Sequence, residues 1–370
     1  IPIVAAPHDN FQLGFDATWE LDLWGRVRRT VEAADADDAA AQALLAQARL
    51  SLQAEVARRY FELRAMQRQV AITREEIATN SDLRDLVATQ TARGLGTDLE
   101  VNRQDAQLAD SRARLPQLQA QEALLINQLT LLVGAQPGAL AQELAPAAEG
   151  QTQTTAQAAA PDFSLGLPSD VALRRPDIQR AQAQLHSATA SIGVAKADLY
   201  PRISIGAAFA LNSVDASTFT DWGSRQWQIG PTLQLPLFDG GRRRATVTLR
   251  ELQQQEAAVN WQQIVLKAWH EIDDSLSTYS AERQRNARLA DMETAGRDAW
   301  ELARVRYSHG LTDQLPALDA QRTYLQARRA LADSTGRLSV DLVAISKALG
   351  VAPTSIASES RSADRIGLLR

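Results

Sequence analysis

The chain has 370 residues, enough for two or three domains of ordinary size. It carries 39 Lys and Arg against 44 Asp and Glu, and the formal charge of −5 argues against nucleic-acid binding, which usually needs a basic excess. Because cysteine is absent, disulfides, thiolate metal sites and cysteine nucleophiles are excluded. No apolar run reaches about 18 residues, so no transmembrane helix is expected. No residue spacing indicates a metal site, a cofactor or an enzyme active site.

An internal repeat organises the sequence, with a constant offset of 216 residues between its copies, as between Gly25 and Gly241. A segment rich in Ala, Gln, Thr and Pro separates the copies and is typical of a linker, and the Ser-rich end is typical of a flexible tail. The offset places the opening helix and first strand of the first copy before residue 1, so we expect the sequence to lack them. The predicted divisions are 1–138 for the first repeat, 139–170 for the linker, 171–353 for the second repeat and 354–370 for the tail.

Strands are predicted where apolar and polar residues alternate, since successive side chains of a strand lie on opposite faces. Alternating runs occupy 11–23, 203–211 and 226–237. One interpretation is a half-buried antiparallel sheet in a soluble protein. The other is a membrane β-barrel, whose strands need about 9–11 residues with apolar side chains outward. Alternation alone does not decide between the two.

Two very long helices are predicted at 27–92 and 242–308, because no proline interrupts either segment. About 65 residues at roughly 1.5 Å each give a helix of about 100 Å, far longer than a globular domain is wide. The helices must therefore lie in a coiled-coil-like assembly. Glycine-containing turns lead into return helices at about 98–133 and 313–349. One chain cannot bury all of the narrow apolar stripes on these helices, which indicates an oligomer.

Five motifs in this duplicated frame resemble the outer-membrane efflux protein family, the TolC-like channels of tripartite efflux and secretion systems. The similarity covers nearly the whole chain and favours the branch that serves resistance-nodulation-division (RND) pumps, whose members are often lipoproteins; no lipidated N-terminal Cys is present here. The motifs are Trp19-Glu20-Leu21-Asp22-Leu23-Trp24-Gly25-Arg26, Leu173-Arg174-Arg175-Pro176-Asp177-Ile178, Ala197-Asp198-Leu199-Tyr200-Pro201, Leu235-Pro236-Leu237-Phe238-Asp239-Gly240-Gly241-Arg242 and Leu318-Asp319-Ala320-Gln321-Arg322.

The resemblance implies a mainly α fold with β structure, in which a homotrimer forms an α-helical periplasmic barrel and a transmembrane β-barrel in outer-membrane lipid. Each protomer would give four strands to the β-barrel, of which three are visible here, and the linker would form part of an equatorial region. The implied activity is passive, gated export of drugs or other small molecules, not catalysis. The implied partners are a periplasmic adaptor (membrane fusion) protein and an inner-membrane RND transporter.

Candidate gate residues lie near the start of the last predicted helix. Where the family narrows at its periplasmic end, this sequence has Leu315, Asp319 and Arg322, which share one helix face at i, i+4 and i+7. In a trimer the Asp319 carboxylates would converge into a cation-attracting constriction, with Leu315 as an apolar collar. Alternatively, Asp319 and Arg322 form an exposed ion pair worth only about 0–1 kcal/mol. Both interpretations stay open at this point.

The two glycine-containing turns are the candidate docking points for the adaptor, although each also fits a plain helix C-cap. Tyr307 and Tyr324 flank the second turn and are candidates for hydrogen bonds that hold the pore shut. The residues of the two turns are Arg93, Gly94, Leu95 and Gly96, and His309, Gly310, Leu311 and Thr312.

Two other classes of protein contain long helical hairpins. A periplasmic adaptor has one hairpin flanked by small β domains, whereas this sequence predicts two equivalent hairpins. A coiled-coil structural protein of an envelope complex has no need of strands with membrane-length apolar faces. The channel is therefore the favoured prediction, and the adaptor and the structural protein are the alternatives.

Overall fold

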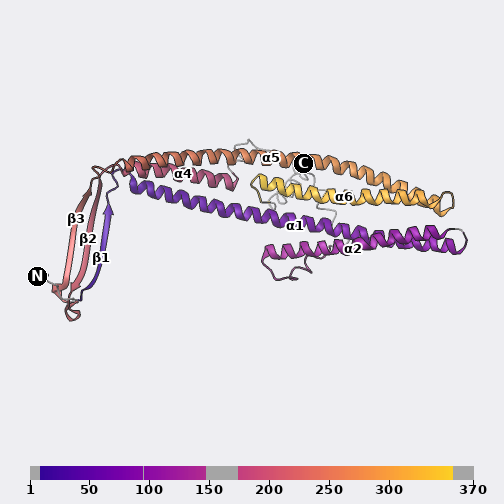
Figure 1. The fold of residues 1–370 in the computed structure, drawn as a ribbon, viewed down its shortest axis with the longest axis horizontal. Coiled ribbons are helices and arrows are strands. Elements are labelled where there is room, and N and C mark those ends of the chain that lie inside the picture. The colour runs from indigo at the N-terminus through magenta and orange to yellow at the C-terminus, as the bar shows by residue number, and fades with distance from the viewer. Residues whose placement is uncertain (1–8, 95, 147–173, 353–370) are drawn as a thin grey trace, which may run out of the picture. The chain divides into compact units, whose positions relative to one another are not determined.

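The computed structural model describes residues 9–94, 96–146 and 174–352, and these residues are mainly helical (Figure 1). No helix in these three ranges is both long enough and apolar enough to cross a bilayer. In chain order the main elements are β1 (Phe11–Glu20), α1 (Arg26–Ala92), α2 (Asp98–Val133), α4 (Pro176–Ala197), β2 (Arg202–Ser213), β3 (Arg225–Gln234), α5 (Arg242–Ser308) and α6 (Gln314–Ala348).

The chain divides into two compact units, and both long helices contribute to each of them. The strand unit comprises residues 1–45 and 177–265, and the helical unit comprises residues 46–176 and 266–370. The helices α1 and α5 each have 67 residues, and their first residues, Arg26 and Arg242, are separated by the repeat offset. The sequence therefore predicted the ends of the long helices to within one residue.

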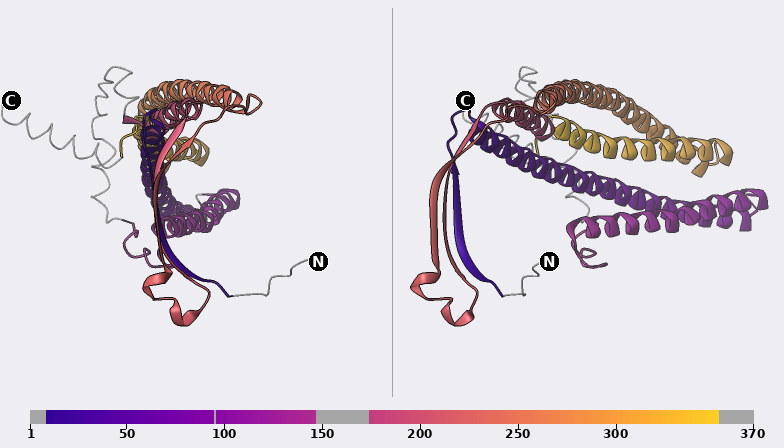
Figure 2. Two further views of the ribbon diagram at one scale, coloured as in Figure 1. Left: turned by 90° about the vertical axis from the view of Figure 1, so that its left-hand side faces the viewer. Right: turned by 60° about the vertical axis from the view of Figure 1, so that its left-hand side comes forward.

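In the strand unit, β1, β2 and β3 form one antiparallel sheet in that order (Figure 2). The register places Phe15 opposite Phe209 and Phe209 opposite Trp227, so aromatic residues of all three strands share one face. The other face carries small and polar residues such as Asp16 and Gln228. The predicted two-faced sheet is confirmed.

The apolar face of this sheet is uncovered within the described residues. Phe15 is 81% exposed and Trp227 is 77% exposed, which is inconsistent with a sheet half-buried in a soluble core. Exposed apolar area of this kind marks a surface that contacts lipid or a partner. The membrane interpretation of the alternation is therefore favoured.

Two strands end earlier than their alternation predicts. The first run extends to Leu23, but β1 ends at Glu20 because the chain then turns and the Asp22 carboxylate accepts hydrogen bonds from the backbone of α1. The third run extends to Leu237, but β3 ends at Gln234, just before Pro236, which has no N–H to donate to a ladder.

In the helical unit, α2 runs back along α1, and α6 runs back along α5 (Figure 1). Both turns contain a glycine with positive φ, Gly94 at 75° and Gly310 at 69°, a conformation that favours glycine. A capping box formed by Thr97 and Glu100 begins α2, since each side chain accepts a hydrogen bond from the backbone N–H of the other residue. The tight reversals predicted from glycine are therefore present.

The core of the helical unit is apolar toward its middle. Leu63, Val70 and Ile345 are almost completely buried, and they include two members of the seven-residue spacing on α1. At Gly336 the α6 backbone comes so close to α1 that an added Cβ would lie 2.5 Å from the Cβ of Ala65. Small residues at this point therefore set the separation of α1 and α6.

Candidate functional site

The predicted gate residues occupy one exposed face of α6 near its N-terminus. Leu315, Asp319 and Arg322 are all exposed, as their common spacing requires. The alternative of an ion pair between Asp319 and Arg322 is wrong for this protomer, since neither forms an ion pair with any described residue. The two residues are three positions apart, a spacing at which side chains on a helix can meet, but these two do not, which leaves both charges available to other groups.

The two turns at the tips of the helical hairpins are largely exposed. In the first turn, Arg93 and Gly94 are exposed and Gly96 is half-buried, while Leu95 lies outside the described residues. The second turn shows the same pattern, with His309, Gly310 and Leu311 exposed and Thr312 half-buried.

Of the two tyrosines that flank the second turn, the structure places one in a hydrogen bond between helices. The hydroxyl of Tyr307 on α5 donates to Oε1 of Gln90 on α1, at 3.0 Å. Burial, and secondarily the charge of Glu100, raise the pKa of Tyr307, which keeps the hydroxyl protonated and able to donate. Tyr324 instead stacks on Trp300, with ring centroids 5.5 Å apart.

Behind the gate face, a buried polar network joins α6 to α1 and α2. The amide of Gln321 donates to Asn80 Oδ1 at 2.8 Å, and Asn80 Nδ2 donates to Ser111 Oγ at 2.9 Å. The hydroxyl of Ser111 donates to Glu76 Oε1 at 2.9 Å, and the Arg329 guanidinium donates to the same oxygen at 3.2 Å. Glu76, Asn80, Ser111 and Gln321 are all buried.

Sequence reasoning missed this network, although a signal for it exists. Asn80 follows the buried Thr73 by seven residues, and Gln321 follows the buried Gln314 by seven. Polar residues therefore occupy the seam where a coiled coil normally places apolar ones. Such polar positions fix the register of the helices at a cost in stability.

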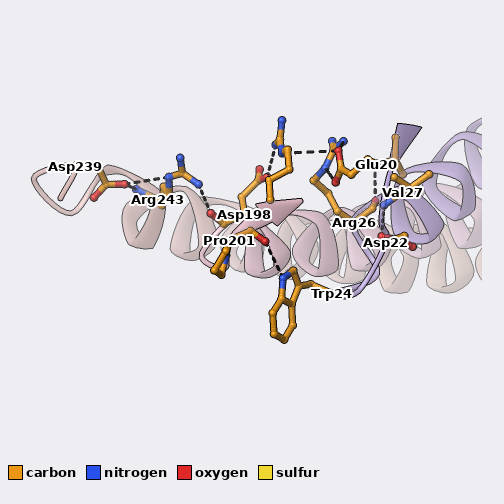
Figure 3. A network of polar contacts seen from close by, with 11 residues as sticks. Glu20, Asp22, Trp24, Arg26, Val27, Asp198, Pro201, Asp239 and Arg243 are labelled. Atoms are coloured by element: carbon orange, nitrogen blue, oxygen red, sulfur yellow. Dashed lines mark hydrogen bonds and ion pairs between the residues drawn. The ribbon is translucent and has the colours of Figure 1, made fainter. Parts of the chain in front are cut away.

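A second polar cluster lies where the strands meet the long helices (Figure 3). The Asp22 carboxylate accepts hydrogen bonds from the backbone N–H groups of Val27 and Arg28, at 2.9 and 3.0 Å, and so caps α1. Desolvation raises the pKa of Asp22, but these hydrogen bonds outweigh it, and the pKa falls below its usual range. Glu20, at the end of β1, accepts a hydrogen bond from Arg26 Nε at 2.8 Å.

The third family motif, at 197–201, joins the same cluster. Trp24 Nε1 donates to the carbonyl of Pro201 at 2.9 Å, and the Trp24 ring stacks on Tyr200 at a centroid distance of 4.6 Å. The guanidinium of Arg243 donates to the carbonyl of Asp198. Three segments that are distant in sequence thus converge on one strand–helix junction, which we define as 20–28, 197–202 and 235–244.

The second repeat caps its long helix with the same chemistry. The Asp239 carboxylate accepts hydrogen bonds from the backbone N–H groups of Gly241 and Arg243, each at 3.1 Å. Asp22 and Asp239 are 217 residues apart, one more than the repeat offset, so the repeats keep the cap but shift it by one position. The motifs Asp-x-x-Gly-Arg and Asp-x-Gly-Arg therefore begin α1 and α5.

The geometry of a two-faced sheet continuing into paired long helices can be compared with known proteins. A family model described as outer membrane efflux protein matches residues 5–135 and 167–351. The chain belongs to the outer membrane efflux protein family.

Relatives of this efflux protein include channels of known structure. The chain is 33% identical over 332 residues to the outer membrane protein OprJ of Pseudomonas aeruginosa, covering 90% of this chain and 68% of that protein. It is 27% identical to the cation efflux system protein CusC of Escherichia coli K12, covering 92% of this chain and 73% of that protein. The solved outer-membrane channel OprN matches with a TM-score of 0.81 and 33% identity, over 95% of this chain and 78% of that structure.

These findings confirm the recognised family, the fold class and the class of function. The protein is an outer-membrane efflux channel whose helices extend into the periplasm, and the two alternatives, the adaptor and the structural protein, are disfavoured. The family is one of channel components of efflux systems. Strand ends that lead into the long helices therefore face the periplasm.

Proposed function

We propose that three copies of this efflux protein form a closed conduit for drugs or other small molecules, with an adaptor and an inner-membrane RND transporter as partners. The observation that carries the proposal is the uncovered apolar sheet face, which continues into helices with uncovered stripes. On α5, Leu252, Val259 and Leu266 repeat every seven residues and are all exposed in the protomer. Such a stripe is stable when a neighbouring helix covers it, and a second copy provides one.

Within this conduit, Leu315, Asp319 and Arg322 form the constriction. Their shared exposed face and the lack of an ion pair between Asp319 and Arg322 in the described chain support this role. Three carboxylates brought together at a symmetry axis attract cations and repel anions. The docking points for the adaptor are the two turns, Arg93, Gly94, Leu95 and Gly96, and His309, Gly310, Leu311 and Thr312, of which Arg93, Gly94, His309, Gly310 and Leu311 are exposed.

The cargo is set upstream by the transporter, because the constriction selects by charge and width and not by chemical structure. Relatives carry names that refer to antibiotics, toluene and cations, a range that fits a generic conduit. We propose the same breadth for this channel.

We expect Asp319→Asn to reduce the preference for potassium over chloride and to lower the single-channel potassium conductance about two-fold or more in planar bilayers, because the carboxylates that attract cations lose their charge while the width of the constriction is unchanged. The matched control is Asp291→Asn, which removes the same charge from an exposed position of α5. Recovery of the complete protein from outer membranes as a detergent-extracted trimer tests the assembly. A soluble monomer would contradict the conduit, whereas unchanged conductance and selectivity in Asp319→Asn would contradict only the constriction.

A smaller effect is expected for Tyr307→Phe. The substitution removes the hydrogen bond between α5 and α1 at the tips, and one such bond contributes about 0.5–1.5 kcal/mol. If this bond stabilises the closed tips, the open probability in bilayers rises by up to about ten-fold. Tyr324→Phe is the control, because Tyr324 contributes its ring and forms no side-chain hydrogen bond with any described residue. Equal open probabilities in the two variants would contradict the role of Tyr307.

A further inference from the structure

The first turns of α1 and α5 carry arginines, although the N-terminal turn of a helix favours acidic residues. Neither first turn contains an acidic residue, while Arg242, Arg243 and Arg244 begin α5 and Arg26 begins α1. The N-terminus of a helix bears a partial positive charge, so arginines there are unfavourable unless negative groups compensate them. Departures from local preference are expected where a residue has a function.

Most of these arginines have a partner within the strand unit. Arg26 is paired with Glu20, Arg28 with Asp22, and Arg243 with Asp239. Arg242 and Arg244 differ, since both are exposed and neither forms an ion pair with any residue that the structure describes. These two positive charges, at one end of α5, therefore remain uncompensated by the described chain.

Two strongly apolar and uncovered residues lie a few positions before these arginines. Leu237 is 86% exposed and Phe238 is 94% exposed, and both follow β3 in the loop that leads to α5. They continue the apolar surface of the sheet to its periplasmic edge. Apolar and aromatic residues followed within a few positions by arginines, as Phe238 is by Arg242, are typical of the boundary between the hydrocarbon core and the headgroups.

We propose that Arg242 and Arg244 bind the phosphate of an anionic phospholipid in the periplasmic leaflet of the outer membrane, with Leu237 and Phe238 among its acyl chains. A guanidinium group donates two parallel hydrogen bonds to phosphate oxygens and stays charged at any physiological pH. The lipid phosphate supplies the negative charge that Arg242 and Arg244 do not meet among the described residues, since Asp239 pairs with Arg243. The surface is continuous with the lipid-facing sheet, so the occupant follows from its place in the membrane.

This lipid site is independent of the proposed constriction. It requires the outer-membrane location of the channel and the charges of the strand–helix junction, whereas Asp319 and the tips lie in the helical unit. A failed gate experiment would leave the lipid site intact, and a failed lipid experiment would leave the gate intact.

The test measures binding of phosphatidylglycerol to the complete detergent-solubilised protein by native mass spectrometry. We expect R242Q/R244Q to weaken binding about ten-fold or more, since two charges near an anionic headgroup are lost. Binding of phosphatidylethanolamine should not change. The matched control R283Q/R288Q removes two exposed arginines from the same helix away from the junction and should bind as the wild type does.

Two further binding measurements, competition with inorganic phosphate and the variant F238A, distinguish a lipid site from a general anion site. Millimolar inorganic phosphate should fail to displace the lipid, and F238A should weaken lipid binding with the arginines intact. The proposal is overturned if R242Q/R244Q binds phosphatidylglycerol as tightly as the wild type, or if R283Q/R288Q loses as much affinity as R242Q/R244Q. It is also overturned if inorganic phosphate displaces the lipid, or if F238A binds the lipid as the wild type does. Circular dichroism spectra that match the wild type show that the variants are folded, and both arginines are exposed, so folding should be retained.

Discussion

Replacing Glu76 by alanine is expected to lower the free energy of unfolding of the helical unit by about 3 kcal/mol, the lower end of the cost of removing one partner of a buried ion pair, because the partner Arg329 is 28% exposed. The Glu76 side chain is 1% exposed, and its Oε1 accepts hydrogen bonds from Ser111 and Arg329. Without this carboxylate, the guanidinium of Arg329 loses its acceptor, and the hydroxyl of Ser111 keeps only the carbonyl of Gln107, at 3.1 Å. The network that reaches Gln321 through Asn80 is interrupted as well.

Two further variants distinguish the effect of the charge of Glu76 from the effect of its volume. Glu76→Gln keeps an oxygen that accepts both hydrogen bonds but removes the charge, so we expect a smaller loss than for alanine. The double variant E76L/R329M replaces the pair by apolar side chains of similar size and should recover most of the stability, because buried ion pairs are seldom more stable than a well-packed apolar contact. Urea denaturation of the complete protein, followed by circular dichroism, gives the free energies. A Glu76→Ala protein as stable as wild type would contradict the role of the network.

This substitution also connects the buried network to the gate. Gln321 lies on the buried side of α6, two residues from Asp319 on its exposed side. A loosened network therefore frees the segment that carries the proposed constriction. We expect larger leak currents for Glu76→Ala than for Glu76→Gln in the same bilayer measurement that tests Asp319.

The long helices could be predicted because their signals are local. Proline-free segments that end in glycine define α1 and α5, and the repeat offset transfers each boundary from one copy to the other. The strand ends were less accurate, since alternation continues past Glu20 and Gln234 while the backbone has already turned. The strand β1 ends where the chain turns and the Asp22 carboxylate accepts a hydrogen bond from the Val27 N–H. An apolar–polar pattern gives no sign of such a hydrogen bond.

The polar interior could not be found by looking for apolar stripes. Glu76 and Arg329 are 253 residues apart in the chain, and only packing of α6 against α1 brings them together. The stripe at Leu252, Val259 and Leu266 was identified, yet it is uncovered in the protomer. Its covering depends on a neighbouring copy, so the sequence indicated an oligomer without showing which surfaces meet. The same holds for the convergence proposed for Asp319, which requires symmetry-related copies.

Replacing Gly336 by leucine is expected to destabilise the helical unit by about 3 kcal/mol, the upper end of the usual cost of overpacking. A Cβ at this position would lie 2.5 Å from the Cβ of Ala65, and neither atom is the end of a flexible side chain. The helices α1 and α6 must separate to admit the new side chain. The clash exceeds the gain of about 1 kcal/mol that a helix obtains when glycine is replaced by a residue with a side chain.

A swap of the two small residues isolates the steric cause. Gly336→Ala alone should be destabilising, whereas A65G/G336A exchanges the two residues, removes the clash and should return the urea midpoint close to that of the wild type. The cost of about 1 kcal/mol for glycine in α1 is offset by a similar gain from alanine in α6. Because α6 also carries Asp319 and Gln321, Gly336→Leu should raise the leak current as Glu76→Ala does. If Gly336→Ala proved as stable as wild type while the swap did not, close contact between α1 and α6 at this level would be refuted.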